Sequence, residues 1–498
     1  MEETSMFQTY TIGIIFLIIF YIIRRPRIGT NEPPLVPYTI PIFGHTYNYL
    51  FNTRKFFKSC EEQYGECFSI YVFGRVMTVV SKSSLNEVFR SHKDFETAIN
   101  EILPFHKIFE HSNGCSDKTI HINAKIAREV SDKFDIYTPI VQKYLLEGID
   151  KWIGDCKESK EIRGTWSLIN NIIALPISKI LVGEEAASYE DVVKSLGDLA
   201  FDLGPISAIP PILAFIHQKL HEFVITLPIR FGWNPISRHR KVIINRIKPV
   251  IEKRVKEKKI LGKDYKPCND MLECYINQPD FDHTNSENFL YYVDALLILT
   301  FGAIGTTSRT VTNGLYDMAG RPDCLNELYE EAMMIDKECN GSVTLPDIQK
   351  MKKLDSFIKE SLRHSDDTLN LPHNVISESY TFANGYTIPK GRIVNLYVDD
   401  LLKSRDGFGD DAEEFKPFRF VNANSPATKV DRHYVVFGGG KHACPGRFFA
   451  INESKLILHK LILKYNIKTK SGKIENKIYI GPNTLPSWNA LVFENRKE

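Results

Sequence analysis

The residues best suited to chemistry lie in a glycine-rich stretch, YVVFGGGKHACPGRFF, at residues 434–449. Two kinds of site use such a stretch: a glycine cradle for phosphate, or a loop that presents Cys444. A phosphate-binding loop needs a glycine five residues before its Gly-Lys pair and a hydroxyl residue directly after that pair. Val435 and His442 occupy those two positions. The phosphate cradle is therefore excluded.

Cys444 is suited to the role of a thiolate ligand to haem iron. The glycines before it, residues 438–440, let backbone N–H groups turn toward the sulfur. A helix that begins near Pro445 would favour negative charge at the same place. Gly446 leaves room for a flat macrocycle, and His442 can hydrogen-bond a haem propionate. The competing interpretation is an inert buried thiol, which is the usual state of a lone cysteine.

The same stretch resembles the haem-binding loop of the cytochrome P-450 family, whose pattern is F-x-x-G-x-[HR]-x-C-x-G. Phe437, Gly440, His442, Cys444 and Gly446 match the five fixed positions of that pattern. The resemblance implies that haem b is the cofactor and that Cys444 is the axial ligand of its iron. It also implies that the other four residues bind the cofactor.

Two further family motifs precede this loop in the expected order. ESLR, residues 360–363, resembles the E-x-x-R pair of the family, and FKPFRF, residues 415–420, resembles the segment that supplies a second arginine. A carboxylate held by two planar guanidinium groups is a geometry that lysine cannot reproduce. We therefore expect Glu360, Arg363 and Arg419 to form a buried network that supports the loop of Cys444.

The segment GAIGT, residues 302–306, resembles the oxygen-side helix of the family, where the pattern is roughly [AG]-G-x-[DE]-T. Thr306 matches the threonine that helps to deliver protons to bound dioxygen, whereas Gly305 replaces the acid. General acid steps need a proton source within hydrogen-bond reach. A group of fungal members that oxidise terpenoids also lacks this acid. We therefore expect monooxygenation, with Thr306, Thr307 and solvent as the proton relay.

The usual W-x-x-x-R anchor for the haem propionates is absent from its expected region. HINAKIAR, residues 121–128, stands in its place. His121, Lys125 and Arg128 are the candidate propionate ligands, and Arg128 is our first choice. An ordinary solvated helix face would explain the same charges.

The chain is predicted to be mainly α with a minor β region. Apolar residues recur three and four apart in most segments, for example in residues 139–153 and 449–465. Residues 288–318 are apolar on nearly all faces at first and predict a helix buried in the middle of the protein. Strand-like runs are short, at residues 67–81 and 376–396, and the second contains an Asn-Gly hairpin signal. The family resemblance implies the cytochrome P-450 fold, here preceded by an N-terminal transmembrane helix.

The N-terminus predicts a membrane anchor. Residues 10–23, YTIGIIFLIIFYII, are uncharged and apolar, and the basic RRPR of residues 24–27 follows them. The run extends to about 18 residues, the minimum for a span, and a cleavable signal would put its basic residues first. We expect an anchor in the endoplasmic reticulum membrane with a cytosolic body. The expected regions are residues 1–27 as anchor, 28–46 as proline-rich hinge and 47–498 as a single haem-binding catalytic domain.

Composition limits the partners of the chain. A net charge of +2 gives no general case for nucleic-acid binding, and nine cysteines without a CxxC pair fit neither a zinc module nor a disulfide framework. No flavin or nicotinamide motif is found, so electrons must come from outside. The resemblance implies NADPH-cytochrome P-450 reductase, with cytochrome b5 as a further partner. The basic residues expected to dock an acidic flavoprotein are Lys429, Arg432, Lys441 and Arg447.

An anchored haem protein with an apolar roof suggests a lipophilic substrate, and the resemblance to fungal members suggests a steroid or terpenoid. We expect residues 201–220 to form a lid that reaches the membrane surface. Phe301, Ala303 and residues 368–373 and 483–488 are expected to line the pocket. Two alternatives stay open: a haem-thiolate hydroperoxide isomerase or dehydratase that needs no reductase, and a non-catalytic haem-binding sensor.

Overall fold

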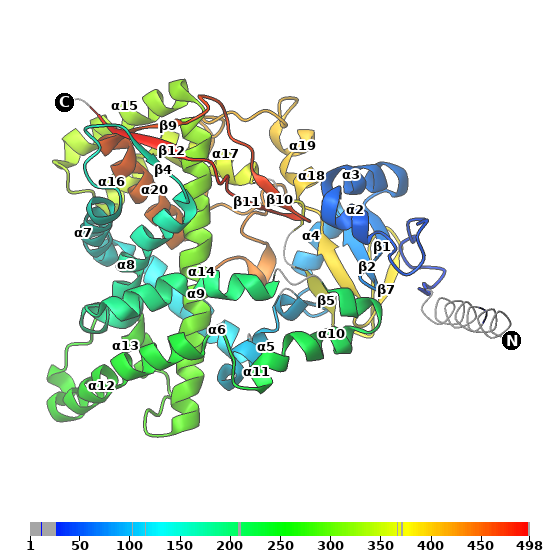
Figure 1. Ribbon diagram of the computed structural model, residues 1–498, viewed down its shortest axis with the longest axis horizontal. Coiled ribbons are helices and arrows are strands. Elements are labelled where there is room, and N and C mark those ends of the chain that lie inside the picture. The colour runs from blue at the N-terminus through cyan, green and yellow to red at the C-terminus, as the bar shows by residue number, and fades with distance from the viewer. Residues whose placement is uncertain are drawn as a thin grey trace, which may run out of the picture.

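The computed structural model describes residue 11 and residues 26–101, 103–114, 116–207, 211–365, 367–369 and 372–496. The predicted anchor, residues 10–23, lies almost entirely outside the described residues. The described chain is mainly helical, and most of its helices surround one long helix, α14 (Ser286–Ala319) (Figure 1). The larger sheet lies at the opposite end of the molecule from most helices, together with the first described residues.

Helix α14 is the buried helix that the sequence predicts for residues 288–318. The Asn285 side chain caps it by accepting hydrogen bonds from the N–H groups of Glu287 and Asn288, both 3.0 Å away. Four threonine hydroxyls along the helix donate to the carbonyl four residues earlier, as in the 2.8 Å bond from Thr300 to Leu296. The helix nevertheless runs without a break over 34 residues.

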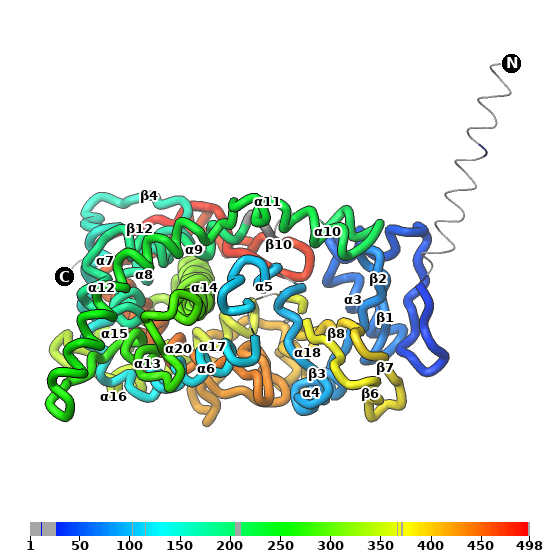
Figure 2. Tube along the Cα trace, turned by 90° about the horizontal axis from the view of Figure 1, so that it is seen from below, coloured from blue at the N-terminus to red at the C-terminus, as the bar shows by residue number. Residues whose placement is uncertain are grey.

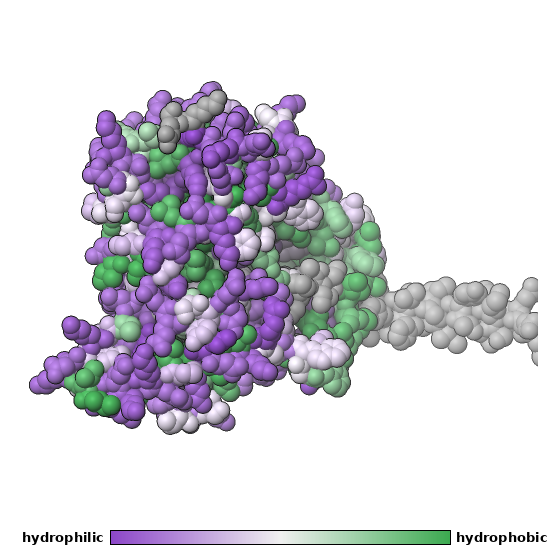
Figure 3. Space-filling model, turned by 60° about the vertical axis from the view of Figure 1, so that its left-hand side comes forward, coloured by the Kyte–Doolittle hydropathy of each residue, from purple (hydrophilic) through white to green (hydrophobic). Residues whose placement is uncertain are grey.

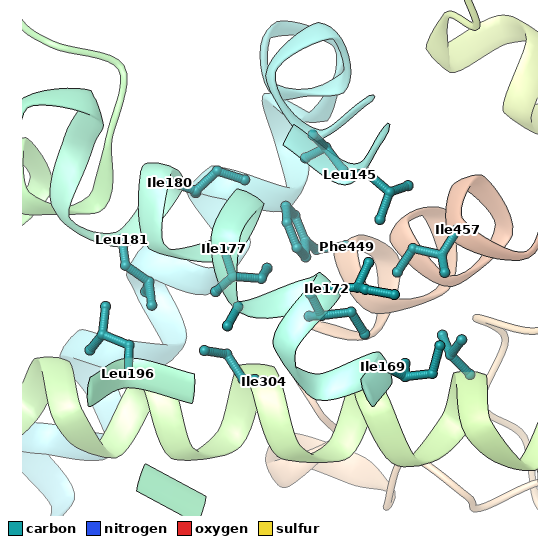
Figure 4. Close-up of a cluster of buried hydrophobic side chains, with 14 of the residues drawn as sticks. Leu145, Ile169, Ile172, Ile177, Ile180, Leu181, Leu196, Ile304, Phe449 and Ile457 are labelled. Carbon is teal, nitrogen blue, oxygen red and sulfur yellow. The ribbon is translucent and has the colours of Figure 1, made fainter. Parts of the chain in front are cut away.

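The largest hydrophobic core lies between α14, α8 (Thr165–Ala186), α9 (Glu190–Ser207) and α20 (Arg447–Lys464). Figure 4 shows Ile304 of α14 facing Ile177 of α8, with Phe449 of α20 beyond them. These large apolar side chains leave little room for movement, because protein interiors are packed as densely as organic crystals. The core therefore holds α14 and α20, the two helices on which the candidate site depends, in fixed relative positions.

The remaining helices complete the helical body. They are α2 (Thr46–Phe51), α3 (Thr53–Tyr64), α4 (Lys82–Arg90), α5 (Phe105–Ile108), α6 (Asp117–Asp132), α7 (Phe134–Trp152), α10 (Gln218–Ile225), α11 (Leu227–Arg230), α12 (Ser237–Leu261), α13 (Met271–Ile276), α15 (Pro322–Cys339), α16 (Leu345–Lys350), α17 (Lys352–Arg363), α18 (Asp399–Leu402) and α19 (Arg405–Phe408), with 3-10 turns at η1 (Ile99–Glu101), η2 (Glu110–Ser112), η3 (Ile212–Phe215), η4 (Gly262–Asp264) and η5 (Gly440–His442).

The larger sheet has five strands in the order β1-β2-β8-β5-β3. Strands β1 and β2 form an antiparallel hairpin, β8 pairs with β2 in parallel, and β5 and β3 continue the sheet in antiparallel pairs. The strands are β1 (Cys67–Val72), β2 (Arg75–Val80), β3 (Phe95–Thr97), β5 (His373–Val375) and β8 (Ile393–Leu396). Three small sheets are formed by β4 (Lys160–Ile162), β12 (Leu491–Asn495) and β9 (Tyr465–Thr469), by β6 (Ser379–Thr381) and β7 (Thr387–Pro389), and by β10 (Ile478–Ile480) and β11 (Asn483–Leu485).

Several sequence-based expectations are confirmed here. Residues 139–153 and 449–465 fall in α7 and α20 except for the last residue of each, and residues 67–80 of the predicted run 67–81 form the hairpin of β1 and β2. Strands β6 and β7 pair around the Asn384–Gly385 turn, where Gly385 has a φ of 91°. Positive φ favours glycine, and this explains the Asn-Gly signal.

The proline-rich segment 28–46 belongs to the globular body and is not a free connector. The Val36 N–H donates to the Ser69 carbonyl over 2.9 Å, and the Ser69 N–H donates to Pro34 over 2.8 Å. Gly44 has a φ of 55° and approaches the backbone of Tyr71 so closely that an added Cβ would lie 2.2 Å from the Tyr71 carbonyl oxygen. This described segment has no long helix or strand, as the prolines predict, and its backbone is docked along β1.

Two of the described helices, α8 and α14, are long and apolar enough to cross a membrane. Both helices pack against each other inside the protein. Core helices of this kind pass the same test of length and composition, so they are weak evidence for a membrane span.

Candidate active site

The loop before Cys444 owes its shape to close contact with α4. Gly438 and Gly440 have φ values of 72° and 59°, which favour glycine. A Cβ added at Gly439 would lie 2.6 Å from the Phe89 ring, and one at Gly440 would lie 2.0 Å from the Phe89 carbonyl oxygen. All three glycines are therefore required, two by backbone conformation and two by the approach of α4.

Cys444 lies at the end of this loop, just before α20. Its N–H donates to the Phe437 carbonyl over 2.8 Å and closes the turn. Burial raises the pKa of the Cys444 thiol, while the N–H groups of Gly446 and Arg447 and the charge of Arg447 act in the opposite direction. The N–H groups at the start of α20 thus face the sulfur, as a thiolate ligand needs.

Arg447 holds the loop rather than extending into solvent. Its guanidinium donates to the Cys444 carbonyl over 2.8 Å and to the Thr428 carbonyl over 3.1 Å. The sequence-based expectation counted Arg447 among the basic residues free to dock a partner, and these two bonds make it mainly a brace for the loop.

Glu360 and Arg363 form a completely buried ion pair in α17. The Arg363 guanidinium donates through Nε and Nη2 to the two carboxylate oxygens, each over 2.8 Å, and Arg363 also donates to the Leu402 carbonyl over 2.9 Å. Burial acts to raise the pKa of Glu360, but the hydrogen bonds from Arg363 and His364 and the charge of Arg363 lower it to about 2. Glu360 is therefore ionised at neutral pH and anchors the chain around it.

Arg419 joins the same carboxylate, as the motif predicts. Its Nε lies 3.3 Å from Glu360 Oε1, and its Nη1 pairs with Asp411. Further bonds run from Arg419 to the carbonyls of Phe408 and Asp411, over 3.0 and 2.8 Å. The structure thus brings Glu360, Arg363 and Arg419 together into one network that fixes the irregular chain between α18 and the loop of Cys444.

One face of α14 is open although the helix runs through the middle of the molecule. A Cβ added at Gly302 meets no atom within 4 Å, and Thr306, one turn later on the same face, is exposed. The Thr306 hydroxyl donates to the Gly302 carbonyl over 2.7 Å. Thr307 is buried, with 3% of its surface exposed, so the two threonines face different surroundings. We call Gly302, Thr306 and the residues beside them the open face of α14.

Gly305, at the position of the missing acid, lies against helix α9. A Cβ added at Gly305 would lie 3.1 Å from the Cβ of Ala200, a distance at which one neighbour has to move. An acidic side chain in this place would need still more room. The departure from the family pattern is therefore coupled to a close approach of two helices.

Three sequence-predicted residues lie along one exposed side of α6. His121, Lys125 and Arg128 are exposed, and their spacing places them on successive turns of one face. His442, in η5, is near the start of this helix: burial, Lys441 and His92 lower its pKa, while Asp117 of α6 acts to raise it. The cationic side chains of α6 and the loop of Cys444 thus belong to the same region.

His373 is a site residue that sequence reasoning placed only in a general pocket lining. It lies in β5, is buried, and its ring is 5.9 Å from the ring of Phe89, the residue that contacts the glycine loop. The pairing of β5 with β8 brings it there. No local pattern around His373 carries this information, because the contact depends on the order of strands in the sheet.

The residues predicted to line the pocket differ in their exposure and in what they contact. Ala303 is partly exposed beside the open face, whereas Phe301 points away from it, with its ring 5.6 Å from that of Phe105. Thr368 is buried, and its N–H donates to the Pro482 carbonyl over 2.7 Å. Residues 370 and 371 lie outside the described part. Trp488 is exposed on the surface, at 69%.

A planar cofactor fits this arrangement. Added Cβ atoms at Gly302 and at Gly446 meet no atom within 4 Å, so open space adjoins both the middle of α14 and the start of α20. The two helices pack against each other through the core. A thiol with backbone donors, an open face with a hydroxyl, and cations on α6 are the groups that a haem with propionates requires.

Comparison with known proteins places these features in a family. A family model for cytochrome P450 matches residues 33–488. Cytochrome P450 monooxygenase 71 of Postia placenta is 25% identical, with 100% of this chain and 99% of the relative covered. Lanosterol 14-alpha demethylase of Candida tropicalis is 24% identical, covering 99% of this chain and 96% of that protein.

A solved structure shares the fold. The retinoic acid-bound cyanobacterial CYP120A1 superposes with a TM-score of 0.69 at 18% sequence identity, and the match covers 94% of this chain and 100% of that one. At this identity the likeness is one of fold.

Proposed function

The chain belongs to the cytochrome P450 family and is a haem b-binding monooxygenase, and from this premise we propose that it hydroxylates a lipophilic steroid or terpenoid with electrons from an NADPH-dependent flavoprotein reductase. The observation that carries the proposal is the open face of α14. An exposed hydroxyl at Thr306 in the middle of a core helix, beside the open space at Gly302, is the place for a substrate to lie against a cofactor.

In this proposal Cys444 would hold the haem iron through its thiolate. Phe437, Gly440 and Gly446 shape its loop, and the N–H groups of Gly446 and Arg447 stabilise the thiolate by hydrogen bonds. The haem, when bound, supplies the redox chemistry that activates dioxygen. The Glu360 network keeps the loop in place and takes no part in the reaction.

The propionates would be held by cations around the loop of Cys444. His442, Lys125, His121 and Arg128 are our candidates, and the position of His373 in β5 adds a fifth. Charge-assisted hydrogen bonds from such groups to a carboxylate are about twice as strong as neutral ones.

Thr306 is the residue we propose to hold the proton-donating water. Its hydroxyl donates to Gly302, so its oxygen lone pairs can accept a hydrogen bond from water on the open face. Thr307 is buried and would act, if at all, by supporting the helix.

A lipophilic substrate is consistent with the site and with the name of one relative. One relative is a lanosterol demethylase, which acts on a sterol. The test is to express the protein with a fungal NADPH-cytochrome P450 reductase, supply a panel of steroids and terpenoids, and search by mass spectrometry for products that have gained one oxygen atom. Absence of any such product, from protein that is loaded with haem, would count against the proposal.

Gly305 favours a second candidate function. Without an acid beside Thr306, a reaction that uses a hydroperoxide and needs no external electrons becomes the alternative: a hydroperoxide isomerase or dehydratase. Dependence of product formation on NADPH and reductase favours the monooxygenase, whereas turnover of a fatty acid hydroperoxide without either favours the alternative. The monooxygenase relatives argue against a haem sensor without catalysis.

The reductase would dock on the basic residues around Cys444. Lys429, Arg432 and Lys441 are exposed there, whereas Arg447 is held by two carbonyls. Electrostatic complementarity of this kind raises association rates. Cytochrome b5, an acidic electron carrier, would use the same surface.

We further propose that the chain is anchored in the endoplasmic reticulum membrane through residues 1–27, with residues 47–498 as the cytosolic catalytic domain. An apolar surface on the described part supports this. It consists of exposed side chains from two separate segments, Ile40, Phe43, Tyr47, Phe51, Ile212 and Ile216. The Phe43 and Phe215 rings are 5.0 Å apart and join the two segments.

Figure 2 shows α10 reaching toward the same end of the molecule as the first described residues, and in Figure 3 hydrophobic residues gather at that end, whereas the helical end is mostly hydrophilic. Apolar surface patches of this kind mark contact with membranes or proteins.

A further inference from the structure

Arg309 is a charged residue on the open face of α14. It follows Gly302 and Thr306 at positions that place all three on one side of the helix. Its side chain is 27% exposed. An arginine beside an apolar reaction space is unusual, because charged groups are costly to remove from water unless they are paired.

Three segments that are distant in the sequence meet at this arginine. Arg309 Nη2 lies 2.8 Å from both carboxylate oxygens of Asp367, which follows α17, and 3.1 Å from the hydroxyl of Thr484 in β11. The Thr484 N–H donates to Asp367 Oδ1 over 2.8 Å, and its hydroxyl donates to the Ser365 carbonyl over 2.7 Å. The acceptors of Asp367 are thus shared between Arg309 and Thr484.

Arg309 keeps donors that this cluster does not use. Among the described residues, neither its buried Nε nor its Nη1 has a hydrogen-bond partner. A guanidinium group carries five N–H donors, and its Nη2 provides only two of them. Because Nε is buried, the unused donors that a ligand on the open face can reach are those of Nη1, on a side chain that is partly exposed.

The charges of Arg309 and Asp367 determine which kind of hydrogen-bond acceptor on a ligand can bind there. Asp367 already neutralises Arg309, and a second carboxylate next to it would meet like-charge repulsion. A hydroxyl or keto oxygen accepts a hydrogen bond from Arg309 without that repulsion. A single polar contact in an otherwise apolar pocket fixes the orientation of a ligand.

We propose that the Arg309–Asp367 pair recognises a hydroxyl or keto oxygen on an otherwise apolar substrate and so sets which end of the molecule faces Thr306. This inference rests on the proposed function, since it assumes that the substrate lies on the open face of α14. It narrows the substrate class to neutral lipophilic molecules that already carry one oxygen.

The test uses three probes with one carbon skeleton: 5α-androstan-3β-ol, 5α-androstan-3-one and 5α-androstane. Their affinities for the haem-loaded protein are measured by titrating the haem absorption. We expect Arg309→Met to weaken binding of the alcohol and the ketone about 10-fold to 100-fold, the loss of one hydrogen bond from a charged donor. Binding of the hydrocarbon should change by less than about 3-fold. Arg309→Lys, which keeps a charged donor, should restore part of the loss.

Thr484→Val is the matched control, because it loosens the cluster but leaves the unused donors of Arg309 in place. It should alter the affinity of the three probes by the same factor. Equal losses for alcohol, ketone and hydrocarbon in Arg309→Met would overturn the proposal and leave Arg309 with a structural role. The carbon monoxide spectrum of each variant shows separately whether the haem-thiolate site is intact. Failure of the proposed function and failure of the proposed role of Arg309 therefore give different results.

Discussion

Two glutamates with completely buried side chains show how partners determine the state of a carboxyl group. Glu360 accepts hydrogen bonds from Arg363 and from the Lys416 N–H, and its pKa is lowered to about 2. Glu453, in the helix that follows Cys444, has no hydrogen-bond partner for either carboxyl oxygen among the described residues, and burial raises its pKa well above 4.5. The first is ionised at neutral pH, whereas burial favours the protonated form of the second.

The two carboxyls affect stability in opposite directions as pH changes. The contribution of Glu360 is fully present above pH 4.5 and is lost as the pH falls toward about 2, because protonation breaks the network. Glu453 binds a proton that the unfolded chain releases above pH 4.5. Its folded form is therefore penalised as the pH rises, until the pH passes its folded-state pKa.

Glu453→Gln should make the protein more stable at alkaline pH than the wild type. Glutamine has the same shape and carries no proton to lose, so the difference in unfolding free energy should be small near pH 5 and grow by up to about 1.4 kcal/mol for each pH unit above it. This difference in stability is measured from the thermal unfolding midpoints of the haem-loaded proteins between about pH 5 and pH 8. Glu327→Gln, the same substitution at a half-exposed ion pair with Lys353, is the surface control. A difference that stays constant over this range would contradict the protonated state of Glu453.

At the scale of elements, the contact between α14 and α9 explains the missing acid. An added Cβ at Gly305 would lie 3.1 Å from the Cβ of Ala200, so the small residues allow the helices to approach. Overpacking a filled core typically costs about 1–3 kcal/mol. The position of the acid is therefore used for packing in this chain.

Gly305→Asp should consequently lose stability rather than gain the activity of an acid-containing relative. We expect the free energy of unfolding to fall by about 1–3 kcal/mol or more, seen as a lower thermal midpoint and a smaller haem content. Ala200→Gly should relieve part of it, so that the double variant is more stable than the sum of the two single changes predicts. The wild type, the two single variants and the double variant form a double-mutant cycle. A coupling energy near zero would show that the contact with Ala200 does not restrict the side chain at residue 305.

The sequence predicts elements better than it predicts their contacts. The structure contains the predicted helix α14 and the predicted contacts of Glu360 with Arg363 and Arg419, because the helical period and short motifs carry this information. The sheet of β4, β12 and β9 is missed, since β4 has only three residues and its partner β12 lies far along the chain, near the C-terminus. The meeting of Arg309, Asp367 and Thr484 is missed for the same reason: three unrelated segments supply one side chain each.

At the scale of the whole molecule, exposed apolar side chains gather near the first described residues of the chain. Phe51, Ile212 and Ile216 are 70, 67 and 52% exposed, and such surface is costly in water at about 25 cal/mol per Å². Phe51 ends α2, and Ile212 and Ile216 lie in and just after η3; the ring of Phe43, shortly before α2, contacts the ring of Phe215 in η3 and so joins the two segments. A membrane surface would cover these side chains and would give the catalytic body a second attachment besides the proposed anchor.

A protein that lacks residues 1–27 should therefore still bind lipid vesicles. Changing Phe51, Ile212 and Ile216 to glutamine in that shortened protein should reduce its partition into phosphatidylcholine vesicles roughly 100-fold, from about 1 kcal/mol for each partly inserted side chain. The control changes three equally exposed apolar residues on other helices, Ile260, Met333 and Met334, to glutamine and should leave the partition unchanged. Co-sedimentation measures all three proteins. Equal loss in both triple variants would mean that vesicle binding follows total hydrophobicity, whereas loss in the first alone locates the membrane-facing side and orients the open face of α14 relative to the bilayer.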